Sequence, residues 1–319
     1  MIKALTALAA ALALPCAAFA QSEHYPSRTI TFICAYQAGS SSDAIVRFMA
    51  DKIRPIAGQT IVVENRQGAN GAVATEALMR AKPDGHTIFV HSPAAIAAND
   101  ALLKTPPANT RTGVRVAATI NRQAFMLAVD TSTPYKTLAD LTAAMKIKGA
   151  KATYATYATT ATITGALYKA GAGIDPVEVV YRIGAQSLND MQSGTLDFGI
   201  YDPLFALAQE RAGRLRPLAI VSDERMDTSP HVPTFKELGM PIVLMGWFSA
   251  IVPAATPQPE VDQINKWFVS VVRQEETKKF LNNIGSEPWI TTPGQAQAQY
   301  LAEFENYRNA VAAAKIEPQ

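Results

Sequence analysis

Residues 36–43 read Tyr-Gln-Ala-Gly-Ser-Ser-Ser-Asp and separate two runs with different hydrophobic patterns. Residues 29–35 are almost continuously apolar, whereas apolar residues recur at helical spacing through residues 44–56. A strand that ends in a loop of small residues and opens a helix directs several backbone N–H groups toward one spot, with the positive end of the helix dipole behind them. The stretch therefore predicts an anion-binding loop at the edge of an α/β sheet.

The first residues of the chain have the pattern of an export signal. Lys3 supplies a positive start, residues 4–14 are apolar, and Ala18-Phe19-Ala20 resembles a cleavage site. No later run is long and apolar enough to span a bilayer. We therefore expect residues 1–20 to be removed and the mature chain to be a periplasmic protein that is not embedded in the membrane.

The amino-acid composition and charge of the chain restrict the kinds of molecule that it is expected to bind. The 319 residues are 48% hydrophobic and 18% charged, which is typical of a folded globular protein. The formal charge is +2, and no basic cluster is present, so nucleic acid is not an expected partner. Cys16 lies in the leader, which leaves Cys34 alone in an apolar run, where a thiol is usually a core residue. We expect no disulfide, metal or cofactor.

Strand and helix patterns alternate along the mature chain and predict two α/β units. Two further segments are placed to cross between the units, and two amphipathic helices are predicted near the C-terminus. The predicted strands are residues 29–36, 60–63, 87–90, 152–157, 175–181, 195–201 and 216–221; the crossing segments are 117–129 and 243–252; the helices are 260–284 and 293–315.

This order predicts two lobes, each a mostly parallel sheet flanked by helices. We expect lobe 1 to comprise residues 21–122 and 248–319, and lobe 2 to comprise residues 123–247. Two crossing strands would form a hinge that allows closure around a small molecule. Such a protein is expected to be a monomer.

Ligands of open α/β sheets bind beyond the carboxyl ends of the strands, and small, hydroxylic and charged residues gather at those predicted ends. The candidate ligand-binding residues are Tyr36, Ala38, Gly39, Ser40, Ser41, Ser42, Asp43, His91, Ser92, Tyr157, Thr159, Thr160, Ala161, Thr162, Arg182 and Asp202.

Four of these candidates have more than one interpretation. Asp43 either caps the helix and orients the loop or contacts the ligand, and repulsion makes it a poor partner for a carboxylate. Asp202, followed by Pro203, fits the N-cap of a helix as well as a ligand contact. His91 is either a cleft histidine or a hydrogen-bonded residue at a strand end. Arg182 could bind a second carboxylate or form a surface ion pair.

Several motifs resemble the Bug or TctC-type receptors of tripartite tricarboxylate transport systems. They are Tyr25-Pro26-Ser27, Glu64-Asn65-Arg66-Gln67-Gly68-Ala69-Asn70-Gly71, Pro83-Asp84-Gly85, Tyr181-Arg182, Val232-Pro233-Thr234 and Pro253-Ala254-Ala255-Thr256-Pro257. The resemblance implies a type II-like, Venus flytrap binding protein that presents a small carboxylate to membrane permease subunits. It also implies that the loops at residues 36–43 and 157–162 hold the carboxylate. The serine-rich first loop and His91 depart from the family pattern, so we expect a different ligand specificity.

Two other functions remain open. A sensor would present the same carboxylate to a membrane signalling receptor. A secreted serine hydrolase would use a serine of residues 40–42 with His91 as its base, and hydrolysis of esters or amides that His91→Ala abolishes would support it. The chain contains no G-x-S-x-G, Walker loop, G-x-G-x-x-G or metal-spaced histidine pair, so its sequence favours binding over catalysis.

Overall fold

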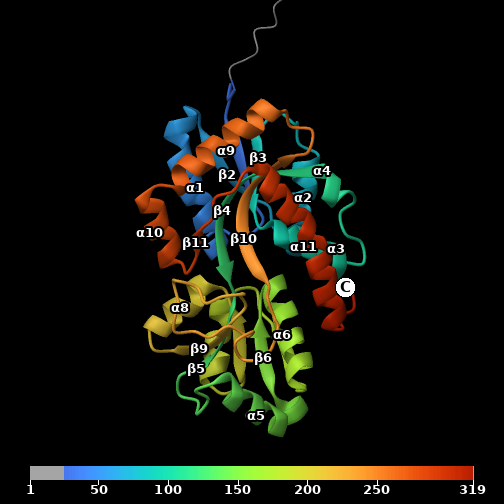
Figure 1. The fold of residues 1–319 in the computed structure, drawn as a ribbon, viewed down its shortest axis with the longest axis vertical. Helices are drawn as coiled ribbons and strands as arrows, with labels where there is room; N and C mark the ends of the chain where they lie inside the picture. The colour runs from blue at the N-terminus through green and yellow to red at the C-terminus, as the bar shows by residue number, and fades with distance from the viewer. Residues whose placement is uncertain (1–24, 319) are drawn as a thin grey trace, which may run out of the picture.

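The computed structural model describes residues 25–318, so the predicted leader at residues 1–20 lies outside the described part of the chain. Two α/β lobes are stacked along the long axis of the molecule (Figure 1). The predicted fold class is confirmed. One detail differs, because both sheets are mixed and not mostly parallel. In the first sheet the strand Met245–Pro253 runs antiparallel to both of its neighbours, and in the second sheet the strand Met126–Asp130 does so.

The first lobe contains a six-stranded sheet. Its strands are β1 (Ile30–Cys34), β2 (Ile61–Asn65), β3 (Thr87–His91), β4 (Val114–Ala124), β10 (Met245–Pro253) and β11 (Glu287–Pro288). Their order is β11-β4-β10-β3-β1-β2. β1 is parallel to β2 and β3, whereas β10 is antiparallel to β3 and β4, and β11 is antiparallel to β4.

Helices cover both faces of this sheet. They are α1 (Ser41–Ala57), α2 (Ala72–Met79), α3 (Pro93–Leu102), α4 (Thr110–Gly113), α9 (Gln258–Val272), α10 (Glu275–Asn283) and α11 (Pro293–Ala313), with a 3-10 turn η1 (Ala69–Gly71). Phe32 and Cys34 face the core beneath α1 and α9, while Ile33 faces α2 and α3. Burial on both faces explains why β1 is a continuous apolar run.

The second lobe contains a five-stranded sheet in the order β7-β6-β8-β5-β9. Its strands are β5 (Met126–Asp130), β6 (Thr153–Thr156), β7 (Val177–Val180), β8 (Phe198–Tyr201) and β9 (Leu215–Ile220). The helices are α5 (Leu138–Lys148), α6 (Thr159–Ala172), α7 (Leu188–Gln192) and α8 (Pro203–Arg211), with 3-10 turns η2 (Gly149–Lys151) and η3 (Gly184–Ser187).

The chain passes between the sheets where the sequence places the crossing segments. β4 belongs to the first sheet and β5 to the second, and only Phe125 separates them. After β9 the chain goes back to the first sheet and enters it as β10, which pairs with β4 along most of its length. β4 and β10 therefore lie side by side where the lobes meet (Figure 1).

The C-terminal helix α11 packs on α3 of the first lobe and also reaches α6 of the second. Tyr300, Phe304 and Tyr307 of this helix join one hydrophobic cluster that continues into both lobes. The lobes are thus in apolar contact on the α11 side, and the cavity described below lies between their strand ends.

Candidate functional site

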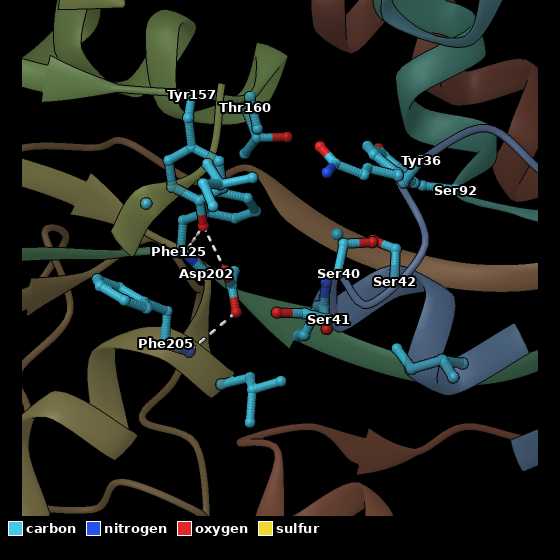
Figure 2. Close-up of a pocket in the computed structure, with 18 of the residues that line it drawn as sticks. Tyr36, Ser40, Ser41, Ser42, Ser92, Phe125, Tyr157, Thr160, Asp202 and Phe205 are labelled. Atoms are coloured by element: carbon cyan, nitrogen blue, oxygen red, sulfur yellow. Dashed lines mark hydrogen bonds between the residues drawn. The ribbon is translucent and has the colours of Figure 1, made fainter. Parts of the chain in front are cut away.

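A cavity of about 320 Å³ lies between the lobes, at the carboxyl ends of the central strands. Figure 2 shows side chains from both lobes facing one another across it. Most of the predicted site residues line this cavity. They are Tyr36, Ala38, Gly39, Ser40, Ser41, Ser42, Ser92, Tyr157, Thr159, Thr160, Arg182 and Asp202.

The loop of the first lobe is organised by its own side chains. Ser40 is the N-cap of α1, and its hydroxyl accepts a hydrogen bond from the Asp43 N–H (3.2 Å). The Asp43 carboxylate in turn accepts one from the Gly39 N–H (2.9 Å). Gly39 has φ +82°, a backbone conformation that suits glycine. Among residues 25–318, Ser41 N–H and Ser42 N–H have no acceptor and remain available at this helix start.

Asp43 does not line the cavity, although it was among the predicted ligand residues. It is 2% exposed, and its carboxylate also accepts hydrogen bonds from Asn65 Nδ2 (2.8 Å) and Arg47 Nε (2.8 Å). Burial opposes its charge, but these donors outweigh burial and hold the pKa of Asp43 below its usual value. The structure therefore places Asp43 behind the loop, as the group that holds the loop in shape.

The loop of the second lobe is organised differently. Ala158 occupies the N-cap position of α6 and has no side chain that can accept a hydrogen bond. The N–H groups of Thr159, Thr160 and Ala161 consequently have no acceptor among residues 25–318. The first turn of α6 contains no acidic residue, so no side chain of that turn offsets the positive end of this helix dipole.

Ala161 and Thr162 do not line the cavity with their side chains. Ala161 belongs to α6 and is buried in the hydrophobic core. The Thr162 hydroxyl donates to Glu178 Oε1 (2.8 Å), which also accepts from Thr156 Oγ1 (2.5 Å). Glu178 thus ties the end of β6 to the start of α6. Of these two predicted residues, only Ala161 has a backbone N–H without an acceptor among residues 25–318, because the Thr162 N–H donates to the Ala158 carbonyl.

His91 also lies outside the cavity wall. It is 1% exposed, and its ring stacks on Phe89 with centroids 4.5 Å apart and packs behind Tyr36 at 5.2 Å. Neither ring nitrogen has a hydrogen-bond partner among residues 25–318. Burial lowers the pKa of His91 to about 3, so the ring is neutral at pH 7. The serine hydrolase alternative therefore lacks the base that it requires in the cavity.

Asp202 lines the cavity and caps α8 at the same time. Its carboxylate accepts hydrogen bonds from the Phe205 N–H (3.0 Å) and from the Tyr157 hydroxyl, and its own N–H donates to Tyr157 Oη (2.7 Å). Ser41 faces this carboxylate from the other lobe (Figure 2). Burial raises the pKa of Asp202, while its hydrogen-bond donors act in the opposite direction. Burial and the adjacent Asp202 charge raise the pKa of Tyr157 well above its usual value.

The other residues that line the cavity were not among the candidates predicted from the sequence, and most of them are apolar. These residues are Gln37, Ile45, Ala95, Gln123, Phe125, Ala158, Ile183, Gly184, Ala185, Leu204, Phe205, Gly246, Phe248 and Ile284. A signal existed for several of them. Gln123, Phe125 and Gly246 lie on the predicted crossing segments, and a ligand held between lobes must contact the strands that join them. Phe205 lies in the first turn of the helix that Asp202 caps.

The cavity thus brings two helix starts together in a setting with almost no charge. Among residues 25–318, no group of three His, Cys, Asp or Glu side chains is placed to hold a metal ion. Over the same residues, no helix combines the length and hydropathy needed to cross a bilayer.

Residues 45–315 match the family described as "Tripartite tricarboxylate transporter family receptor". The chain belongs to this family. It is 26% identical over 299 residues to BugT of Bordetella pertussis strain Tohama I, covering 92% of each chain.

Solved structures agree with this assignment. The R. palustris protein Rpa4515, determined with adipate, is 26% identical with a TM-score of 0.85, over 92% of this chain and 100% of that one. The periplasmic binding protein BugD has the same fold, with 23% identity and a TM-score of 0.83 over 92% of this chain and 100% of that one. The family resemblance predicted from the sequence is confirmed, and the family and fold are those of periplasmic binding receptors.

Proposed function

We propose that the protein captures a small carboxylate between its lobes in the periplasm and delivers it to the membrane permease of a tripartite tricarboxylate-type transporter. The observation that carries this proposal is the start of α6, where the N–H groups of Thr159, Thr160 and Ala161 have no acceptor among residues 25–318 and Thr159 and Thr160 line the cavity. A carboxylate is the ordinary partner of such a helix start.

The second helix start supports the same conclusion. Ser41 and Ser42 line the opposite wall, so an anion between the loops receives donors from both lobes. A ligand with contacts to both lobes stabilises the closed arrangement over an open one. The proposed ligand is a mono- or dicarboxylate, with aromatic ones included, and the related Rpa4515 was determined with the dicarboxylate adipate.

Closure would occur about the paired strands β4 and β10. We assign residues 21–122 and 248–319 to one moving lobe and residues 123–247 to the other, with residues 1–20 as a cleavable leader. The receptor acts as a monomer without cofactor or catalysis. Its ligand-binding residues are the predicted ones that line the cavity, except Ser40, whose hydroxyl caps α1, together with the Ala161 N–H.

Mass spectrometry of the small molecules that co-purify with the protein tests the proposal first, because it identifies a bound ligand directly. A thermal-shift panel follows, in which each carboxylic acid is paired with its primary amide, for example benzoate with benzamide. A ligand present at 100 times its Kd adds about 2.7 kcal/mol of stability. We expect acids to raise the melting temperature and their amides to leave it unchanged. Stabilisation by neutral sugars alone would contradict the proposal.

A further inference from the structure

The cavity wall contains two charged side chains, and they are placed differently. Arg182 is exposed at the rim, and its guanidinium has no acidic partner among residues 25–318. Asp202 lies within the wall, between Tyr157 and the first turn of α8 (Figure 2). The negative charge therefore faces the ligand space more directly than the positive one.

Hydrogen-bond donors hold Asp202 in place and favour its ionised form. The backbone N–H of Phe205 can only donate, so Oδ1 must accept. Tyr157 Oη accepts from the Asp202 N–H, which leaves its own proton to point at Oδ2. The Ser41 hydroxyl adds a donor from the first lobe. The carboxylate cannot rotate away from an incoming anion without losing these bonds.

The remainder of the wall is uncharged, and aromatic and aliphatic side chains make up much of it. Phe125 lies between β4 and β5, Phe205 on α8 and Phe248 on β10, and Leu204 and Ile284 also line the cavity. These groups favour an apolar ligand body and offer no hydrogen bond to a second carboxylate.

We infer that Asp202 is a specificity-determining residue that restricts this receptor to ligands with one carboxylate on an apolar body. The inference rests on the proposed function and narrows its ligand class. The single carboxylate binds between the α6 and α1 helix starts, and the body lies against the phenylalanines. A dicarboxylate would bring a second negative charge into a space of about 320 Å³ that already contains the Asp202 charge.

Isothermal titration calorimetry with hexanoate and adipate tests the inference, because the two chains have the same length and differ in one terminal carboxylate. We expect the wild-type protein to bind hexanoate at least about tenfold more tightly than adipate, since like charges in a cavity of low dielectric repel strongly. Asp202→Asn keeps the shape of the side chain and removes its charge. This variant should narrow the preference to less than about threefold, mainly through tighter binding of adipate.

Asp175→Asn is the matched control, because it removes the same charge from the second lobe at a side chain that is 79% exposed and outside the cavity. It should leave the ratio of the two affinities unchanged. If Asp202→Asn does not fold, the ratio of the hexanoate and adipate affinities of the wild-type protein tests the inference alone. Adipate binding as tightly as hexanoate or more tightly would overturn the inference and leave the receptor function intact. If neither these acids nor any carboxylate of the thermal-shift panel binds, both the inference and the proposed function are wrong.

Discussion

The two loops that face each other across the cavity begin their helices in opposite ways. In the first lobe, Ser40 caps α1, and the buried carboxylate of Asp43 lies in the first helical turn. In the second lobe, Ala158 leaves α6 without a side-chain cap, and no acidic residue lies in its first turn. Both helix starts keep free N–H groups, but those of Ser41 and Ser42 in the first lobe lie beside the buried Asp43 carboxylate, whereas those of the second lobe have no acidic residue in their helical turn.

Because of this difference, the two lobes contribute differently to ligand binding. A loop held by Asp43 keeps its shape whether or not a ligand is bound, which lowers the entropy lost on binding. A helix start without a cap gains most from an external anion, because no side chain of its own first turn accepts a hydrogen bond from its free N–H groups. The comparison therefore indicates that lobe 1 provides a rigid wall and that α6 of lobe 2 provides most of the attraction for the carboxylate.

The largest effect is expected from Asp43→Ala, which should destabilise the protein by about 3 kcal/mol, because it removes a buried carboxylate that accepts three hydrogen bonds. Chemical denaturation measures the loss. Arg47→Ala is the control, since the side chain of Arg47 is 48% exposed and its ion pair should contribute less than about 1 kcal/mol. Equal unfolding midpoints for Asp43→Ala and the wild type would show that the first loop does not depend on this carboxylate.

Ala158→Asp should make the second loop resemble the first. A side-chain cap at this position is expected to stabilise the protein by about 1 kcal/mol and to weaken carboxylate binding by about 2 kcal/mol, because the new carboxylate uses the free donors and repels the ligand. Melting temperature and calorimetric affinity should thus move in opposite directions. Ala158→Asn caps α6 without a charge, so it should weaken binding less. Unchanged affinity in a more stable Ala158→Asp protein would mean that the ligand does not use α6.

Deleting one donor from each loop compares the lobes directly. Proline is accepted at the first position of a helix and lacks an N–H, so Thr159→Pro removes a donor from α6 and Ser41→Pro removes one from α1. We expect about a tenfold loss of affinity, or about 1.4 kcal/mol, for Thr159→Pro and a smaller loss for Ser41→Pro. Thr159→Ala and Ser41→Ala retain the N–H and serve as controls. A larger loss at Ser41 would reverse the assignment of roles to the two lobes.

The smallest change in stability and affinity is expected from substituting Ser40, the N-cap of α1. Ser40→Ala removes the acceptor of the Asp43 N–H and should lower stability by about 1 kcal/mol. Carboxylate affinity should change little, because Asp43 still holds the Gly39 N–H. Thermal unfolding and titration of the same variant separate the two quantities. A loss of affinity greater than the loss of stability would indicate that Ser40 binds the ligand directly.

Local patterns predicted most of the fold. The apolar run before Tyr36 and the serine loop after it predicted β1 and α1, because burial on both faces and helix capping leave strong local signals. The predicted helix at residues 260–284 is in fact two, α9 and α10, because Gln274 is extended (φ −69°, ψ 138°). No proline or glycine marks that break, so the sequence pattern continues across it.

The site was harder to predict where packing decides orientation. His91 and Ser92 follow one another at the end of β3, yet Ser92 lines the cavity and His91 is buried behind Tyr36. Adjacent residues of a strand point to opposite faces, and the sequence does not show which face meets the cavity. Ile284 lines the cavity from a segment distant in sequence, so local patterns could not associate it with the two loops.

A crystal structure of the protein with its bound carboxylate is the most direct test of the role given to α6. We expect carboxylate oxygens about 2.7–3.1 Å from the backbone nitrogens of Thr159, Thr160 or Ala161, with Ser41 or Ser42 on the opposite side. A carboxylate held by the Arg182 guanidinium at the rim, with only water at the start of α6, would contradict it.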